Sequence, residues 1–68
     1  MITWIDVSSS NVLAVGFENT TNEICVRFNN GSEYAYPGTE KEYNDILKTP
    51  SVGGYVSNVL KHRRFRKL

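Results

Sequence analysis

Alternating apolar and polar positions predict a β-hairpin in the middle of the chain. Residues 24–28 place large apolar side chains at every second position, as in a strand that buries one face. Residues 32–36 form the partner strand, and Pro37 ends it because proline cannot donate a hydrogen bond to the ladder. Between them, Asn30-Gly31 predicts a type I′ turn, since both residue types tolerate positive φ angles.

Two earlier segments also favour strands. Residues 12–17 place Leu13, Val15 and Phe17 on one face by period two, so we expect these three side chains to share one face of a strand. Residues 2–7 are rich in β-favouring side chains and are a candidate for a short N-terminal edge strand.

The last third of the chain changes to a helical period. Thr39 and Glu42 have the spacing of a capping box, which predicts a short helix that ends before Pro50. Ser51 is the predicted cap of a second helix. The apolar stripe of that helix, at i, i+3, i+4, i+7 and i+8, consists of Val52, Tyr55, Val56, Val59 and Leu60. The sequence therefore predicts an α+β fold, in which an antiparallel three-stranded meander is followed by two short helices packed on one face.

The composition fits one small domain that spans residues 1–68. Hydrophobic residues make up 40% of the chain, as in ordinary globular domains. No apolar run approaches the roughly 20 residues of a membrane span, and residues 1–6 lack the basic and apolar regions of a secretory signal. One cysteine and one histidine cannot form an internal disulfide or a four-ligand zinc site. We therefore expect a cytoplasmic protein that needs no cofactor, metal or membrane.

The charge is distributed unevenly along the chain. Residues 1–60 carry three basic and seven acidic side chains, a net charge of −4, whereas residues 61–68 carry five basic and no acidic side chains, a net charge of +5. The five basic residues are Lys61, Arg63, Arg64, Arg66 and Lys67. Such a cluster is a candidate phosphate-binding patch, and the alternative is a solvated terminal run that keeps the protein soluble.

Catalytic chemistry has little support in the sequence. His62 lies in the basic run with no acidic residue near it, so a Ser-His-Asp arrangement is not indicated. Cys25 alternates with predicted core residues, which favours a packing role over a nucleophile. Glu40 and Glu42 are placed to cap the first helix rather than to act as an acid–base pair. We therefore expect no enzymatic activity and no catalytic residues.

Two further features suggest binding. Tyr34 and Tyr36 leave one face of a strand; exposed, they would stack on nucleic-acid bases, and packed against the helices they would belong to the core. The start of the second helix is a candidate anion site, because its backbone N–H groups lack helical partners and two glycines let a phosphate approach. Its residues are Ser51, Gly53, Gly54 and Tyr55. The alternative there is that the glycines fit a tight turn between the helices.

The order and spacing of several short motifs resemble the KTSC domain, a short domain named for the C-terminus of some lysyl-tRNA synthetases. The resemblance runs from about Val7 to Leu68. It is carried by Ser9-Ser10-Asn11-Val12, Val15-Gly16-Phe17-Glu18, the segment 26–31, Tyr34-Ala35-Tyr36, the segment 50–55, and Leu60, Phe65 and Leu68. The association with a synthetase implies an expectation of RNA binding.

Three functions remain open on the sequence. The first is a module that binds RNA or another polyanion, with the basic segment 61–68 on phosphates and the tyrosines on bases. The second is a protein-interaction or inhibitor module, such as a small phage-type or accessory protein that docks on a host or cellular protein. The third is a nucleotide-binding or sequestering protein that uses residues 51–55. If the basic segment and the tyrosines share a face, the first function is favoured, and if they lie on opposite faces, the second is favoured. A pocket at Gly53-Gly54 lined by tyrosine and arginine would favour the third.

Overall fold

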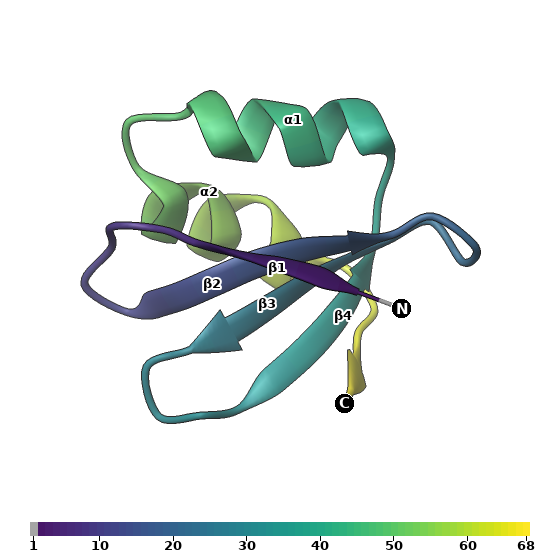
Figure 1. Ribbon diagram of the computed structural model, residues 1–68, viewed down its shortest axis with the longest axis horizontal. Coiled ribbons are helices and arrows are strands. Elements are labelled where there is room, and N and C mark those ends of the chain that lie inside the picture. The colour runs from purple at the N-terminus through teal and green to yellow at the C-terminus, as the bar shows by residue number, and fades with distance from the viewer. Residues whose placement is uncertain (1) are drawn as a thin grey trace.

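The computed structural model describes residues 2–68 and has a layer of helices over one face of a curved antiparallel sheet (Figure 1). The strands are β1 (Thr3–Asp6), β2 (Val12–Glu18), β3 (Glu23–Phe28), β4 (Glu33–Pro37) and β5 (Arg66–Lys67), and they lie in the order β1-β2-β3-β4-β5. The helices are α1 (Glu40–Lys48) and α2 (Val52–Asn58), followed by a 3-10 turn, η1 (Leu60–His62). The predicted α+β class and the two helices are confirmed, but the sheet has five strands rather than three.

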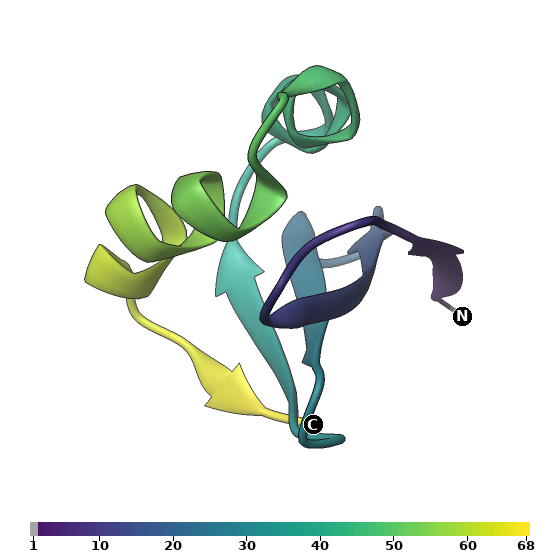
Figure 2. The same cartoon turned by 90° about the vertical axis from the view of Figure 1, so that its left-hand side faces the viewer.

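The fifth strand comes from the basic segment. After η1 the chain turns back and runs beside β4, as the view from the side shows (Figure 2). Ala35 pairs with Arg66 and Tyr34 with Lys67, and the backbone N–H of Leu68 donates to the carbonyl of Glu33 at 2.9 Å. Two paired residues are too few for an apolar alternation, so nothing in the sequence pattern indicated this strand. Two residues of the basic segment are therefore part of the sheet, and their side chains remain exposed.

A β-bulge overturns one predicted face. The register of β2 against β3 shifts between Val12 and Ala14, which inserts one unpaired residue into the strand. Leu13 is that residue and is 47% exposed, whereas Val12 and Val15 are buried. The expectation that Leu13 would share one face of the strand with Val15 was wrong, because an extra residue inverts a period-two alternation.

The hairpin between β3 and β4 is present, but its turn differs from the predicted one. The N–H of Gly31 donates to the carbonyl of Phe28 at 2.9 Å, and the N–H of Phe28 donates to the carbonyl of Ser32 at 2.8 Å. Gly31 has φ +89°, whereas Asn30 does not have a positive φ. The loop is therefore a three-residue loop with glycine in the left-handed region at its third position, and the two-residue type I′ turn was wrong.

The core lies between the helices and the middle of the sheet. Val15, Ile24 and Val26 are fully buried on the covered face of the sheet. The helices bury the following residues against them: Tyr43, Ile46, Val52, Val56 and Leu60. Of the predicted stripe of α2, Tyr55 and Val59 are only half-buried. Val59 falls short of the prediction because α2 ends at Asn58 and the chain changes to a 3-10 turn there.

Candidate functional site

The helices leave one end of this sheet face uncovered, and a groove of about 600 Å³ lies there. Its walls come from segments far apart in the sequence, namely the loop before β2, the β3–β4 hairpin, η1 and the residue before β5. The aromatic lining consists of Phe28, Tyr34, Tyr36 and Phe65. The polar lining consists of Ser10, Asn11, Asn29, Asn30, Ser32 and Lys61. A concave site with aromatic walls and a few polar groups is typical of ligand-binding sites.

The two predicted tyrosines share this face but differ in exposure. Tyr36 is 3% exposed and belongs to the core cluster, and burial raises the pKa of its hydroxyl. Tyr34 is half-buried, with its ring between Phe28 at a centroid distance of 5.9 Å and Phe65 at 5.4 Å. Phe65 is 57% exposed and is the most exposed ring of the groove. The accessible aromatic surface therefore belongs mainly to Tyr34 and Phe65.

Two basic side chains lie on the same side as these rings. The Nζ atom of Lys61 lies 5.4 Å from the centroid of the Phe28 ring. Lys67 is paired in register with Tyr34, so its side chain leaves the sheet on the groove side. Arg64 is exposed in the segment that joins η1 to β5. Within residues 2–68, none of these three cations forms an ion pair with a carboxylate.

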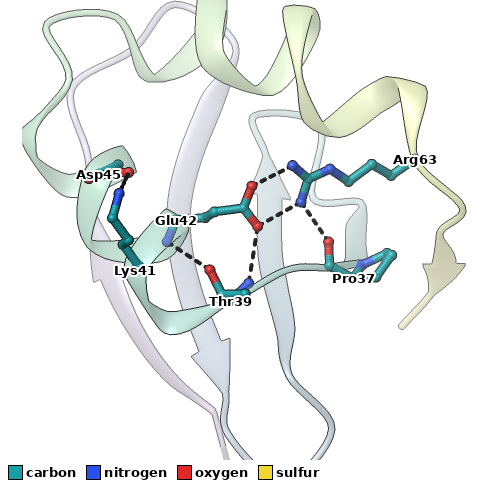
Figure 3. Close-up of polar contacts among 6 residues, drawn as sticks. All are labelled: Pro37, Thr39, Lys41, Glu42, Asp45 and Arg63. Carbon is teal, nitrogen blue, oxygen red and sulfur yellow. Dashed lines mark hydrogen bonds and ion pairs between the residues drawn. The ribbon is translucent and has the colours of Figure 1, made fainter.

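Arg63 holds the basic segment against α1. Its guanidinium donates from Nη1 to Oε1 of Glu42 and to the carbonyl of Pro37, both at 2.9 Å, and from Nη2 to Oε2 of Glu42 (Figure 3). Glu42 also closes the predicted capping box with Thr39. The hydrogen bond from Arg63 is the main reason why the pKa of Glu42 is lowered to about 2. The carboxylate thus joins the start of α1 to the chain beyond η1.

Arg66 anchors the same segment on the opposite face of the sheet. Its Nε and Nη2 atoms each lie 2.9 Å from an oxygen of Glu23, a bidentate pair across β4. The hydrogen bond from Arg66 lowers the pKa of Glu23. Two of the five predicted phosphate-binding residues are therefore paired with carboxylates of the acidic body, and the other three are Lys61, Arg64 and Lys67.

The opposite face of the sheet contains a similar arrangement of cation and ring, but its charge is neutralised. The guanidinium of Arg27 lies 4.3 Å from the centroid of the Trp4 ring, and its Nε donates to Glu33 at 2.6 Å. Lys61 likewise lies over an aromatic ring, that of Phe28, but it has no carboxylate partner among the described residues. The groove is thus the place where aromatic rings and uncompensated positive charge meet.

The start of α2 has a packing explanation for its glycines. A Cβ atom at Gly53 would lie 2.5 Å from Oδ1 of Asn11, so a side chain at this position would displace the Asn11 side chain of the loop before β2. The hydroxyl of Ser51 is already used, because it accepts a hydrogen bond from the N–H of Gly54 at 3.1 Å. A cavity of about 310 Å³ lies beside these residues, and within the described chain no tyrosine, lysine or arginine lines it. Tyr55 is half-buried against the core cluster. The pocket that the nucleotide hypothesis requires is therefore not formed here.

The remaining reactive side chains have structural surroundings. Cys25 is 1% exposed, and burial raises the pKa of its thiol to about 11, which suits the expected packing role. His62 is exposed in η1. Among residues 2–68, no group of three or more His, Cys, Asp or Glu side chains is placed to hold a metal ion. None of the helices in that range has the length and apolar character needed to cross a membrane.

Sequence reasoning missed several residues of the groove. Phe28 was expected only as a strand residue, and Asn29 and Asn30 only as part of a turn. Phe65 carried a signal, because it is an aromatic residue between two arginines, the interleaving of rings and cations that is common in nucleic-acid-binding segments. The asparagines carried none, since their place beside the rings depends on how the hairpin packs against the loop before β2.

The fold and the groove define a small α+β domain with an open aromatic site at one end of its sheet. A profile of the KTSC domain matches residues 8–65, and the chain belongs to the KTSC domain family. Its structure is similar to the crystal structure of a KTSC domain protein from Yersinia pestis, with a TM-score of 0.89 and 24% sequence identity over 100% of this chain and 99% of that one. At this identity the likeness shows the fold. No significant match to this chain is found among curated protein sequences.

Proposed function

We propose that the protein is a non-enzymatic module that binds single-stranded RNA along the groove. The observation that carries this proposal is the meeting of exposed rings with cations that lack carboxylate partners on one face of the sheet. Lys61, Arg64 and Lys67 contact phosphates, and Tyr34 and Phe65 provide the aromatic surface for stacking. Arg63 and Arg66 position the segment through their ion pairs with the body. A cytoplasmic site of action, which the unpaired thiol of Cys25 suits, is part of this proposal.

The choice of a single strand follows from the rings. Bases in a duplex are stacked on one another, whereas unpaired bases can turn outward and stack on aromatic side chains. Each such stack contributes about 1–3 kcal/mol of binding free energy. Each phosphate neutralised on a single strand contributes about −0.7 to the slope of log affinity against log salt. With three contacts we expect a slope of about −2.

The test is a fluorescence-anisotropy titration of a labelled ten-nucleotide RNA of mixed sequence at several salt concentrations. The variant Lys61→Gln/Lys67→Gln should bind more weakly and with a slope nearer −0.7, since about one of the three contacts would remain. The matched control is Lys41→Gln/Lys48→Gln, which changes the net charge equally on α1, away from the groove. Absence of binding by the wild type at low salt would exclude the proposal. Equal weakening by both variants would show that only net charge matters.

A protein-docking surface is the second candidate, favoured by the exposed apolar side chains at the end of the chain. Phe65 is 57% and Leu68 41% exposed beside the edge strand β5. A short exposed edge and apolar side chains are features that protein partners use. A pull-down from lysate with and without ribonuclease separates the two candidates. A partner protein that is retained after ribonuclease, together with no RNA binding in the titration, would favour docking.

A further inference from the structure

The rings of the groove are set at steep angles to one another. The planes of Phe28 and Tyr34 make an angle of 68°, and those of Tyr34 and Phe65 an angle of 85°. A series of roughly parallel rings suits the stacking of several successive bases of a strand. Rings that enclose an angle instead receive one base, with its face on one ring and its edge against the next. Phe65 offers the face, because it is the most exposed of the three.

The β3–β4 hairpin beside these rings is fixed to the loop before β2. The N–H of Asn29 donates to the carbonyl of Asn11 at 3.1 Å, and its side-chain Nδ2 donates to the carbonyl of Ser10 at 2.6 Å. Oδ1 of Asn30 accepts from the N–H of Ser32 at 3.0 Å. Each amide is therefore held at one end, and its orientation is set before any ligand arrives. Such preorganisation lowers the entropic cost of binding.

Asn29 and Asn30 both line the groove, and each amide keeps hydrogen-bonding capacity that the described residues do not use. With one N–H of its Nδ2 engaged, Asn29 keeps Oδ1 free as an acceptor, and with its Oδ1 engaged, Asn30 keeps the two N–H donors of Nδ2 free. Among residues 2–68 neither free end has a hydrogen-bond partner. A binder that ignores sequence needs only rings and cations. A neutral donor and a neutral acceptor suit instead the edge of a base, which carries both.

We propose that the groove takes one unpaired base of a single-stranded RNA and distinguishes it from the other three bases through the amides of Asn29 and Asn30. This inference rests on the proposed RNA binding. It adds that the module prefers one base at one position of the bound strand, and that flanking nucleotides are held through their phosphates alone. Lys61, whose ammonium group lies at the wall of the groove, is placed to hold a phosphate next to that base.

The experiment compares four pentaribonucleotides that differ only in the middle base, each flanked by two abasic nucleotides on either side, so that only one base can enter the groove. We expect the tightest and the weakest of the four to differ by about tenfold or more, as is usual for a well-placed side-chain contact to a base edge. The variant Asn30→Asp keeps the acceptor for Ser32 and replaces the donor by a carboxylate oxygen, so the discrimination should fall below about threefold. The control Asn19→Asp makes the same charge change in the β2–β3 turn, at the opposite end of the sheet (Figure 1), and should preserve the ranking of the four bases.

The outcomes separate this inference from the proposed function. Measurable and equal affinity for all four RNAs would overturn base recognition and leave RNA binding in place. No binding to any of them would overturn both. Discrimination that persists unchanged in a folded Asn30→Asp protein would show that the amide of Asn30 does not read the base. The comparison of four RNAs on the wild type needs no variant, so it decides the main point even if Asn30→Asp does not fold.

Discussion

Tyr36 and Tyr34 leave the same face of β4 two residues apart, yet one lies in the core and the other in an open groove. Tyr36 pairs in register with Ile24, whose side chain is fully buried beneath the helices. Tyr34 pairs with Val26 on one side and with Lys67 of β5 on the other. The difference arises where the helical layer stops, because α2 ends at Asn58 and η1 turns the chain toward the sheet edge (Figure 2). The coverage of a side chain, more than its type, thus separates the structural part of this face from the candidate binding part.

Removing one ring from each part tests most directly whether the two parts differ in role. Tyr36→Ala should lower the free energy of unfolding by about 3–5 kcal/mol, the usual cost of deleting a buried aromatic side chain. Phe65→Ala should cost about 1 kcal/mol or less, since more than half of the ring is already exposed. Urea unfolding followed by circular dichroism measures both. The effects on RNA binding should have the reverse order. Phe65→Ala, titrated under conditions where it is fully folded, should weaken RNA binding more than Tyr36→Ala does. Equal loss of stability in the two variants would mean that Phe65 belongs to the core.

Much of the covered part could be predicted from the sequence, because its signals are local. Alternation identified β3 and β4, and the spacing of Thr39 and Glu42 identified the start of α1. The errors occurred where the signal depends on distant parts of the chain. The bulge at Leu13 changes which side chains of β2 are buried, but the types of residue in the strand give no sign of it. The strand β5 is held by pairing with β4 and by two ion pairs, none of which leaves a periodic pattern.

The charge pattern was informative but incomplete for the same reason. The sequence identified the excess of cations in residues 61–68, but not which of them find partners in the acidic body. Glu42 lies 21 residues from Arg63, and Glu23 lies 43 residues from Arg66. Pairing at such separations is decided by the path of the chain. The uncompensated charge is therefore smaller than the +5 of the segment suggests, and it lies at Lys61 in η1, at Arg64 in the exposed link and at Lys67 on the groove side of β5.

The ion pair between Glu42 and Arg63 joins the start of α1 to the chain beyond η1, and it can be weakened without changing the size of either side chain. Glu42→Gln keeps the side-chain oxygen that accepts from Thr39, since glutamine also serves in a capping box, but it removes the charge that Arg63 contacts. We expect a loss of about 1–3 kcal/mol in the free energy of unfolding, typical of a hydrogen bond to a charged group. The control Asp45→Asn removes the exposed pair with Lys41, at 3.5 Å, and should cost no more than about 0.5 kcal/mol.

The pH dependence identifies the charge as the cause. The pKa of Glu42 is lowered to about 2 from an ordinary value of 4.5, so its contribution to stability is fully present above pH 4.5 and is lost as the pH falls toward 2. The difference in stability between the wild type and Glu42→Gln, measured by urea unfolding from pH 7 down to pH 2, should therefore shrink over this interval. A difference that stays constant to pH 2 would show that the variant acts through packing and not through the ion pair with Arg63.

The smallest expected effect concerns the hairpin that carries Asn29 and Asn30. Gly31 has φ +89°, and no atom lies within 4 Å of the position that a Cβ would occupy, so a side chain there meets backbone strain but no steric clash. Gly31→Val should cost about 1–2 kcal/mol, because a β-branched residue resists this conformation. Gly31→Asn should cost less, since asparagine adopts the left-handed region more readily. Thermal unfolding of both variants measures the difference. Because the turn lies at the open end of the sheet and not under the helices, we expect Gly31→Val to fold with a native core and to unfold in one cooperative transition. An equal melting temperature for Gly31→Val and the wild type would contradict the left-handed assignment of residue 31.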